Sequence, residues 1–395
     1  MRTSRYTLPT LACFLAFACA TPPEAGEEAP TDPTTPEPAV TTSEAPPASA
    51  PWPTFRGDVA RTGAVEGVTL LRQPQRSWRV ETGGKVESSP TVWGGRVYVG
   101  SFAEHLFAYD AATGEEAWRF HVGALVRASP SVVDGVVYFG ADDDRFYALD
   151  TTSGEEIWSF DLGPGGEQSS PAVVDGRVVF GAFDHNVYAL DATTGEEIWR
   201  YATGGGILSS PAVAEGQVFI GSVDGKLHAI DLATGEGRWT FDTGEPVFGS
   251  AAVVDGVVFF GSYDDHVHAL EASDGSVMWS YQTGGDVFST PAVVGGVVFV
   301  GSDDGHLYAF DAVDGTVRWK RDLGGRILAS PLVLADGLVI GSSDGHLYAL
   351  NPSDGEGIWR YEVNAIVWSS ATATPEGIFF GAHDGSVTAL VEGAP

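Results

Sequence analysis

Cysteine is almost absent from this chain of 395 residues, since its only two, Cys13 and Cys19, lie within the first 20 positions. The rest of the chain therefore has no disulfide, no thiolate metal site and no cysteine nucleophile. Basic residues are also scarce, with 21 Lys and Arg against 53 Asp and Glu and a net charge of −32. A field of this sign repels phosphate backbones, so we expect no nucleic-acid binding.

The first 18 residues have the features of an export signal. Two arginines in the first five positions precede an apolar run, residues 8–18, that is too short to span a bilayer. The run ends Ala16-Phe17-Ala18-Cys19, which resembles the cleavage box of bacterial lipoproteins and implies that Cys19 is lipidated. Ala20 rather than Asp follows, which by the same resemblance implies the outer membrane. Ordinary secretion without lipidation is the alternative.

Residues 19–51 consist mainly of Pro, Ala, Thr and Glu, with hardly any large apolar side chain. Such a segment cannot bury enough surface to order itself, so we predict a disordered tether. Folded sequence begins at Trp52-Pro53-Thr54-Phe55-Arg56-Gly57-Asp58. We call residues 52–74 the lead-in segment and expect it to pack on the domain that follows.

A unit of about 40 residues then recurs from residue 75 to residue 391. It carries one tryptophan, at positions Trp78, Trp118, Trp158, Trp199, Trp239, Trp279, Trp319 and Trp359. It also carries one constant glycine, at positions Gly100, Gly140, Gly181, Gly221, Gly261, Gly301, Gly341 and Gly381. Within one unit, residues 129–133, 136–141, 145–149 and 155–160 read as strands separated by tight turns such as Asp134-Gly135. Four antiparallel strands per 40 residues are the unit of a β-propeller blade.

The two ends of the repeat complement each other. The last unit stops at Leu390 without a fourth strand or a tryptophan, whereas Trp78 lies in a strand with no unit before it. We therefore predict an all-β, eight-bladed β-propeller of four-stranded antiparallel blades, closed by this N-terminal strand joining the C-terminal blade. A seven-bladed ring with a loose terminal unit is the alternative.

The eight tryptophans are predicted to dock neighbouring blades. A large flat ring can fill the wedge between two blades, provided that a small residue such as the turn glycine lies opposite. The turn aspartate, as in Asp191, can accept hydrogen bonds from the turn amides. We assign these residues structural roles and none in catalysis.

The pattern Ala-x-Asp-x-x-Thr-Gly-x-x-x-Trp, as in Ala189 to Trp199, resembles the tryptophan-docking repeat of eight-bladed propellers of the pyrroloquinoline quinone (PQQ) type. The start of the lead-in segment resembles the usual opening of that family. The resemblance implies one of two kinds of protein. One is the quinoprotein dehydrogenases, which bind PQQ with a metal; the other is non-enzymatic scaffolds, typified by the BamB lipoprotein of outer-membrane β-barrel assembly.

The sequence favours the scaffold. The resemblance implies that a dehydrogenase would use a carboxylate and an Asn for its metal, and often a pair of adjacent Cys, but the repeats hold no Cys and only Asn186, Asn351 and Asn364. The units are also too uniform to contain a long pocket-forming loop. We therefore expect a monomeric, non-enzymatic binding scaffold of the cell envelope, with protein partners, a lipid anchor as its only membrane contact, and no PQQ or metal. A PQQ-dependent dehydrogenase and a small-ligand or sensor propeller are the alternatives.

Histidines recur at one position of the repeat, five residues after the constant glycine, as His105, His266, His306 and His346. Equivalent positions on packed sheets are about 10 Å apart, whereas metal–nitrogen bonds are about 2 Å, so these residues cannot share a metal.

One position of the repeat varies while its neighbours stay small. Thirteen residues before each constant glycine stand Glu87, Arg127, Gln168, Leu208, Phe248, Phe288, Leu328 and Trp368. This position precedes the innermost strand, so we expect these residues, the funnel-rim set, to surround one mouth of the central channel. They form either a contact surface for a partner or small ligand, or a plug of the channel mouth.

Overall fold

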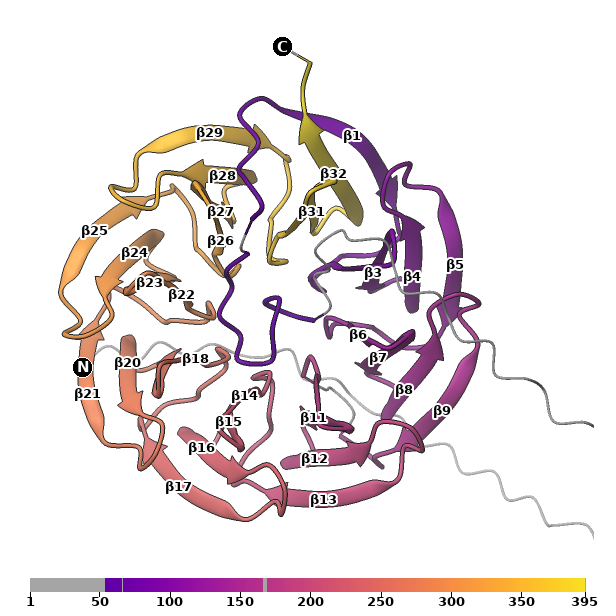
Figure 1. Ribbon diagram of the computed structural model, residues 1–395, viewed down its shortest axis with the longest axis vertical. Coiled ribbons are helices and arrows are strands. Elements are labelled where there is room, and N and C mark those ends of the chain that lie inside the picture. Colours follow the sequence, from indigo (N-terminus) through magenta and orange to yellow (C-terminus); the bar gives the residue numbers. More distant parts are fainter. Residues whose placement is uncertain (1–53, 66, 166–168, 395) are drawn as a thin grey trace, which may run out of the picture. The chain divides into compact units, whose positions relative to one another are not determined.

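Residues 54–65, 67–165 and 169–394 are described by a computed structural model. The chain divides into residues 1–45 and residues 46–395, and all described residues belong to the second unit. They form eight four-stranded antiparallel sheets arranged in a ring around a central axis (Figure 1). The predicted eight-bladed propeller is therefore confirmed. The predicted export signal, Cys19 and the tether lie outside the described residues.

The blade built from β6 (Ser131–Val133), β7 (Val136–Ala141), β8 (Arg145–Asp150) and β9 (Glu156–Asp161) shows how the sequence makes each unit. Its first turn has positive φ at both Asp134 and Gly135, the conformation that matches strand twist in a two-residue hairpin. The two middle strands are almost fully buried, whereas the outer strand β9 is largely exposed. The apolar core therefore lies between blades.

Six further blades repeat this order along the chain. Their strands are β2 (Thr91–Trp93), β3 (Arg96–Ser101), β4 (His105–Asp110), β5 (Glu116–His121); β10 (Ala172–Val174), β11 (Arg177–Gly181), β12 (Asn186–Asp191), β13 (Glu197–Ala202); β14 (Ala212–Ala214), β15 (Gln217–Gly221), β16 (Lys226–Asp231), β17 (Gly237–Asp242); β18 (Ala252–Val254), β19 (Val257–Gly261), β20 (His266–Glu271), β21 (Val277–Gln282); β22 (Ala292–Val294), β23 (Val297–Gly301), β24 (His306–Asp311), β25 (Val317–Asp322); and β26 (Leu332–Leu334), β27 (Gly337–Gly341), β28 (His346–Leu350), β29 (Gly357–Glu362).

The eighth blade joins the two ends of the repeat. Strand β1 (Pro74–Glu81) pairs with β32 (Ser386–Glu392), which continues to β31 (Gly377–Gly381) and β30 (Thr372–Thr374). The register runs from Pro74 opposite Glu392 to Glu81 opposite Ser386. This confirms closure by the N-terminal strand, and it rules out the seven-bladed alternative.

The innermost strands are shorter than the sequence pattern indicates. Ser129 and Pro130, expected within a strand, precede β6, because their polar groups bond to neighbouring blades rather than within the sheet. The backbone N–H of Ser129 donates to the hydroxyl of Ser170 at 2.9 Å, and the same bond links the equivalent residues of successive blades. Seven such bonds of 2.8–3.2 Å surround the axis, including one from Ser370 back to Ser89.

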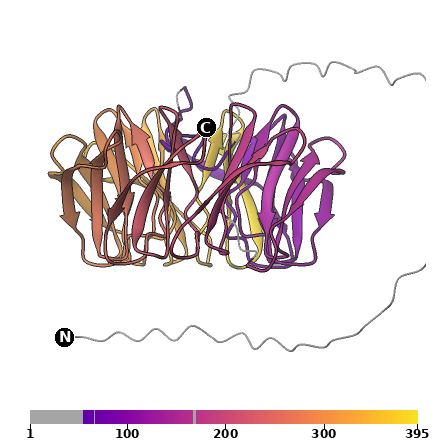
Figure 2. The ribbon, with the colours of Figure 1, turned by 90° about the horizontal axis from the view of Figure 1, so that it is seen from below.

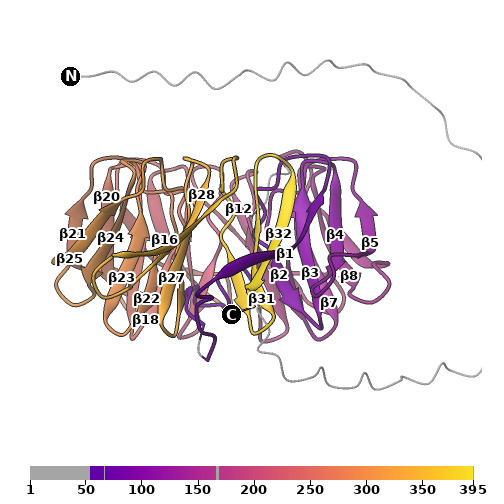
Figure 3. The same ribbon diagram turned by 90° about the horizontal axis from the view of Figure 1, so that it is seen from above.

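The lead-in segment lies at one face of this ring (Figure 3) and reaches its centre (Figure 1). Its carbonyls at Val59, Ala60, Thr62 and Gly63 accept hydrogen bonds from the middle residues of four successive inner strands, β14, β18, β22 and β26. Arg56 and Arg61 are 1% and 0% exposed. Burial lowers the pKa of each guanidinium to about 9, so both remain charged at neutral pH.

Arg61 joins the lead-in segment to the ring. Its guanidinium donates to the carbonyls of Ser170, Pro171 and Pro211 at 3.0–3.2 Å, and to the hydroxyl of Thr54 at 3.0 Å. In side view the segment projects beyond the blades at the same face (Figure 2). Within the described part of the chain, no helix has the length and apolar character needed to cross a membrane.

Candidate functional site

The funnel-rim set lies at the other end of the inner segments from the lead-in segment. Four members, Leu208, Phe248, Phe288 and Leu328, stand five residues before the inner-strand residue that donates its N–H to that segment, as Leu208 stands before Val213. Six members are half-buried, namely Glu87, Arg127, Leu208, Phe248, Phe288 and Trp368. Leu328 is buried, and Gln168 lies outside the described residues.

Aromatic side chains converge across the axis on this face, which we call the rim face. Phe288 contacts Trp368 edge-on with ring centroids 5.6 Å apart, although these residues precede the inner strands of blades that are not adjacent. Phe248 lies 6.4 Å from Phe288 and 4.6 Å from Tyr263, and Trp368 stacks on His383 at 5.5 Å. This aromatic arc is only half-buried, so it presents apolar surface at the channel mouth.

The opposite side of the rim face is polar. The Arg127 guanidinium donates to Asp142 at 3.0 Å, lies 3.8 Å from Glu87, and covers the ring of Phe102 at 4.7 Å. Burial raises the pKa of Asp142, and Arg127 opposes that shift. Glu87 also lies 3.2 Å from His383, so polar contacts connect this sector to the aromatic arc.

A second group of variable residues on this face was missed by the sequence reasoning. It occupies the turn between the second and third strands of each blade, two residues after the constant glycine: Phe102, Asp142, Phe183, Val223, Tyr263, Asp303, Ser343 and His383. Several of these residues donate their backbone N–H to the loop that carries a rim residue, as Tyr263 does to Pro246. Phe183 is 43% exposed. The signal was available, because this position also varies beside a constant glycine.

Carboxylates gather beside the aromatic arc. Burial, followed by the charges of Asp303 and Asp265, raises the pKa of Asp286 to about 6. Burial, followed by the charges of Asp303 and Asp286, raises the pKa of Tyr263 to about 12. Arg326 forms an ion pair with Asp303. The rim face therefore combines an apolar centre with charged flanks.

The tryptophans lie between blades, where each indole N–H donates to a main-chain carbonyl. For seven of them the acceptor is in the turn after the third strand of the next blade, at 2.9–3.1 Å. A Cβ on the turn glycine of that blade would lie 2.6–2.7 Å from a tryptophan ring atom, so only glycine allows the contact. The turn aspartate also acts as reasoned from the sequence: Asp191 accepts from the amides of Thr193 and Thr194 at 2.9 Å.

The eighth tryptophan has a different partner, because the C-terminal blade ends before that turn. Trp359 donates instead to the carbonyl of Leu71 at 2.6 Å. The lead-in segment thus supplies the acceptor that a complete eighth repeat would have provided.

The recurring histidines do not come together. The Nδ1 atoms of His105 and His266 each lie 2.6 Å from a backbone carbonyl two residues earlier, within their own turn. Among the described residues, no group of three or more His, Cys, Asp or Glu could hold a metal ion.

Comparison with solved structures finds similar folds of two kinds. BamB from Moraxella catarrhalis is 21% identical with a TM-score of 0.71, and the match covers 80% of this chain and 99% of that one. The quinohemoprotein alcohol dehydrogenase from Comamonas testosteroni is 16% identical with a TM-score of 0.76, covering 88% and 81%. At these identities the likeness concerns the fold alone. A search of curated proteins finds no match.

The profile of one protein family matches residues 64–182, 147–251, 227–366 and 284–391. These overlapping matches cover most of the chain and nearly all of the propeller. The chain therefore belongs to the family described as outer membrane protein assembly factor BamB.

Proposed function

We propose that this protein is a non-enzymatic binding or assembly scaffold of the bacterial cell envelope, and that it contacts protein partners through the rim face. The observation that carries the proposal is the half-exposed aromatic arc of Phe248, Phe288 and Trp368 at the channel mouth. Aromatic side chains at the centre of a surface with polar flanks are typical of protein interfaces. The family description, an outer membrane assembly factor, supports partners in that machinery.

We further infer that the channel holds no PQQ, because the residues at its two mouths do not fit that cofactor. PQQ is a flat aromatic acid that needs cations for its carboxylates and an open face for its ring. On the rim face Phe288 and Trp368 meet across the axis, and Arg127 and Arg326 are paired with carboxylates. The lead-in segment occupies the other mouth. Purified protein mixed with PQQ and calcium should therefore gain neither cofactor absorbance nor dye-reducing activity.

The rim face is tested by replacing Phe248, Phe288 and Trp368 together with Ser. Crosslinking and pull-down from membranes should recover outer-membrane assembly proteins with the natural chain and lose them with this variant. Because the three rings are half-buried, we expect the melting temperature to fall by less than about 3 °C.

The matched control replaces three exposed apolar residues of the outer strands, Ile157, Ile198 and Val277, with Ser. This variant should keep its partners. A rim variant that retains its partners but melts about 8 °C or more below the natural chain would show that the aromatic arc only plugs the channel.

A further inference from the structure

Arg321 interrupts a pattern that the other blades keep. It stands two residues after the docking tryptophan, where six other blades have an aromatic residue and the closing blade has Val80. The aromatic residues are Phe120, Phe160, Tyr201, Phe241, Tyr281 and Tyr361. The aromatic residues at this position reach the next blade: Phe120 contacts Tyr147 at 5.4 Å and Tyr281 contacts Phe310 at 4.9 Å, measured between ring centroids. A ring at this position therefore fills the outer wedge between neighbouring blades.

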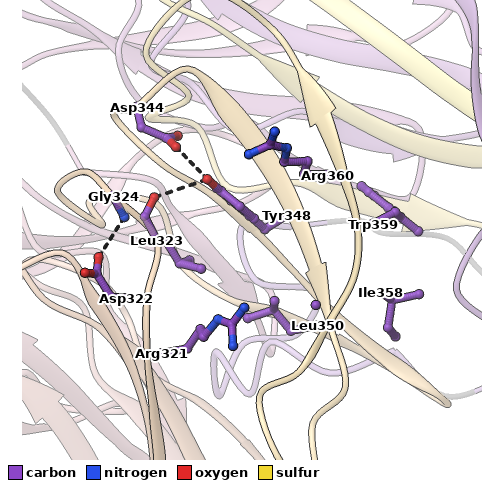
Figure 4. A pocket seen from close by; sticks show the side chains of 11 residues that line it. Arg321, Asp322, Leu323, Gly324, Asp344, Tyr348, Leu350, Ile358, Trp359 and Arg360 are labelled. Carbon is purple, nitrogen blue, oxygen red and sulfur yellow. Dashed lines mark hydrogen bonds between the residues drawn. The ribbon is translucent and has the colours of Figure 1, made fainter.

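Where Arg321 replaces the ring, the wedge is open. A pocket of about 650 Å³ lies between the end of β25 and the strands β28 and β29 of the following blade. Figure 4 shows Tyr348 and Leu350 between the side chains of Arg321 and Arg360, with Ile358 and Trp359 to one side. Volumes of 300–1,000 Å³ are typical of sites for small ligands.

The pocket combines apolar walls with two guanidinium groups. Leu323 and Leu350 are buried, and Trp359 is half-buried. Within the described part of the chain, the Arg321 side chain makes no ion pair or hydrogen bond, and it lines the opening. Arg360 lies on the other side of Tyr348.

The two carboxylates in the lining already accept hydrogen bonds. Asp344 accepts from the Tyr348 hydroxyl at 2.5 Å, and Asp322 accepts from the backbone N–H of Gly324 at 2.8 Å. The Tyr348 hydroxyl also contacts the carbonyl of Leu323 at 3.2 Å. Burial raises the pKa of Tyr348, and Arg360, which faces its hydroxyl, opposes that shift. Arg321 is therefore the guanidinium of the pocket that is left for a ligand, in a chain whose acids outnumber its bases by more than two to one.

We propose that this wedge pocket binds a carboxylate carried on a short apolar body, with Arg321 pairing to the carboxylate and the apolar part lying against Leu350, Ile358 and Trp359. A guanidinium next to apolar walls suits such a ligand, because a planar carboxylate accepts two parallel N–H bonds while its body leaves water. Two sources share this chemistry, a free small acid and the last residue of a peptide. The site is separate from the rim face, so it stands or falls independently of the proposed function.

The test uses 4-phenylbutyrate and its amide as matched probes, titrated against the full chain by saturation-transfer difference NMR. We expect saturable binding of the acid with a Kd on the order of 1 mM, and binding of the amide at least tenfold weaker. N-acetyl-Leu-Phe with a free carboxyl end, compared with its amidated form, distinguishes a peptide end from a free acid. The source is a peptide end if that peptide binds more tightly than phenylbutyrate, and a free acid if it binds more weakly.

Two variants separate charge from shape. Arg321→Tyr restores the ring of the other blades, so it should fill the pocket, abolish binding and raise the melting temperature by about 1–3 °C. Arg321→Gln leaves the pocket open and should remove the preference for acid over amide. Equal binding of acid and amide by the natural chain, unchanged binding by Arg321→Tyr, or no saturation up to about 10 mM would each overturn the proposal.

Discussion

Replacing Arg61 with Met should weaken the hold of the ring on its lead-in segment. The Arg61 side chain is fully buried. It donates to three carbonyls just before the inner strands β10 and β14, and to the Phe55 carbonyl and the Thr54 hydroxyl. Met keeps most of the volume but leaves these acceptors without a donor. At about 1 kcal/mol per lost acceptor, offset in part by the removal of a buried charge, the free energy of unfolding should fall by about 3–4 kcal/mol.

This loss can be measured in two ways. A folded part of some 340 residues has an unfolding entropy of about 0.7 kcal/mol/K, so the melting temperature should fall by about 4–6 °C. If the lead-in segment detaches first, trypsin should cut after Arg56, which is buried in the natural chain. The matched control is Arg200→Met on an exposed strand, where loss of the ion pair with Glu197 should change stability by less than about 0.5 kcal/mol. A melting temperature within 1 °C of the natural value, with no cleavage at Arg56, would refute the assigned role.

Three further predictions concern the rim and the blades. Asp286→Asn should raise stability by about 1 kcal/mol at pH 7.5 and by only about a third of that at pH 4.5. The unfolded carboxyl ionises above its ordinary pKa, whereas the folded state holds its proton up to a pKa of about 6, so the destabilisation by Asp286 grows between these values; urea midpoints at the two pH values decide, and equal gains at both would contradict this. Burial lowers the pKa of His228, so stability should fall as pH drops below about 6.5, where the unfolded chain takes up a proton that the folded chain resists. His228→Tyr should remove this part of the pH dependence in the same urea assay, and an unaltered pH profile would count against the prediction. Gly195→Ala should lower the free energy of chemical unfolding by about 2–4 kcal/mol, since its Cβ would meet the Trp158 ring at 2.6 Å. The control Gly176→Ala has a similar φ but open space around it, so it should lower that free energy by only about 1 kcal/mol; equal losses would mean that the ring contact is unimportant.

The repeat made the ring predictable, because each unit contains the residues that determine its strands, its turns and its contact with the next blade. Turn residues such as Asp134-Gly135 and alternating apolar positions specify four strands, and the tryptophan with its turn glycine specifies how one blade meets the next. Closure could be predicted because the last repeat lacks a fourth strand, whereas one strand stands before the first repeat. These signals are local or periodic, so they can be read without knowledge of the packing.

The placement of Arg56 and Arg61 could not be predicted in the same way. A charged residue in a short irregular segment is ordinarily exposed, and nothing near it in sequence indicates burial. The acceptors of Arg61 on the blades are carbonyls of residues more than 100 positions away, and they converge only when the ring exists. For the rim face, the sequence placed Phe248 and Trp368 at equivalent positions, but the second variable position, including Tyr263 and His383, was overlooked.

The wedge pocket could be predicted from the sequence only in part. When the repeats are aligned on their tryptophans, the sequence shows Arg321 at a position that is aromatic in most other repeats. What the alignment does not give is the consequence, because a long arginine could equally have covered the gap. Only the arrangement of Tyr348 and Leu350 on the neighbouring blade shows that the space stays open.

The pairing of β1 with β32 has a consequence for the order in which the molecule can form. Glu81 lies opposite Ser386, so the first strand of the ring finds its partner 305 positions later. At about 5–20 residues per second this wait is on the order of 15–60 s, during which the earlier blades can assemble but the ring cannot close. The Trp359 indole depends in the same way on Leu71. Ring closure therefore waits for the synthesis of β32, and a chain that stops short of β32 leaves β1 without its partner strand.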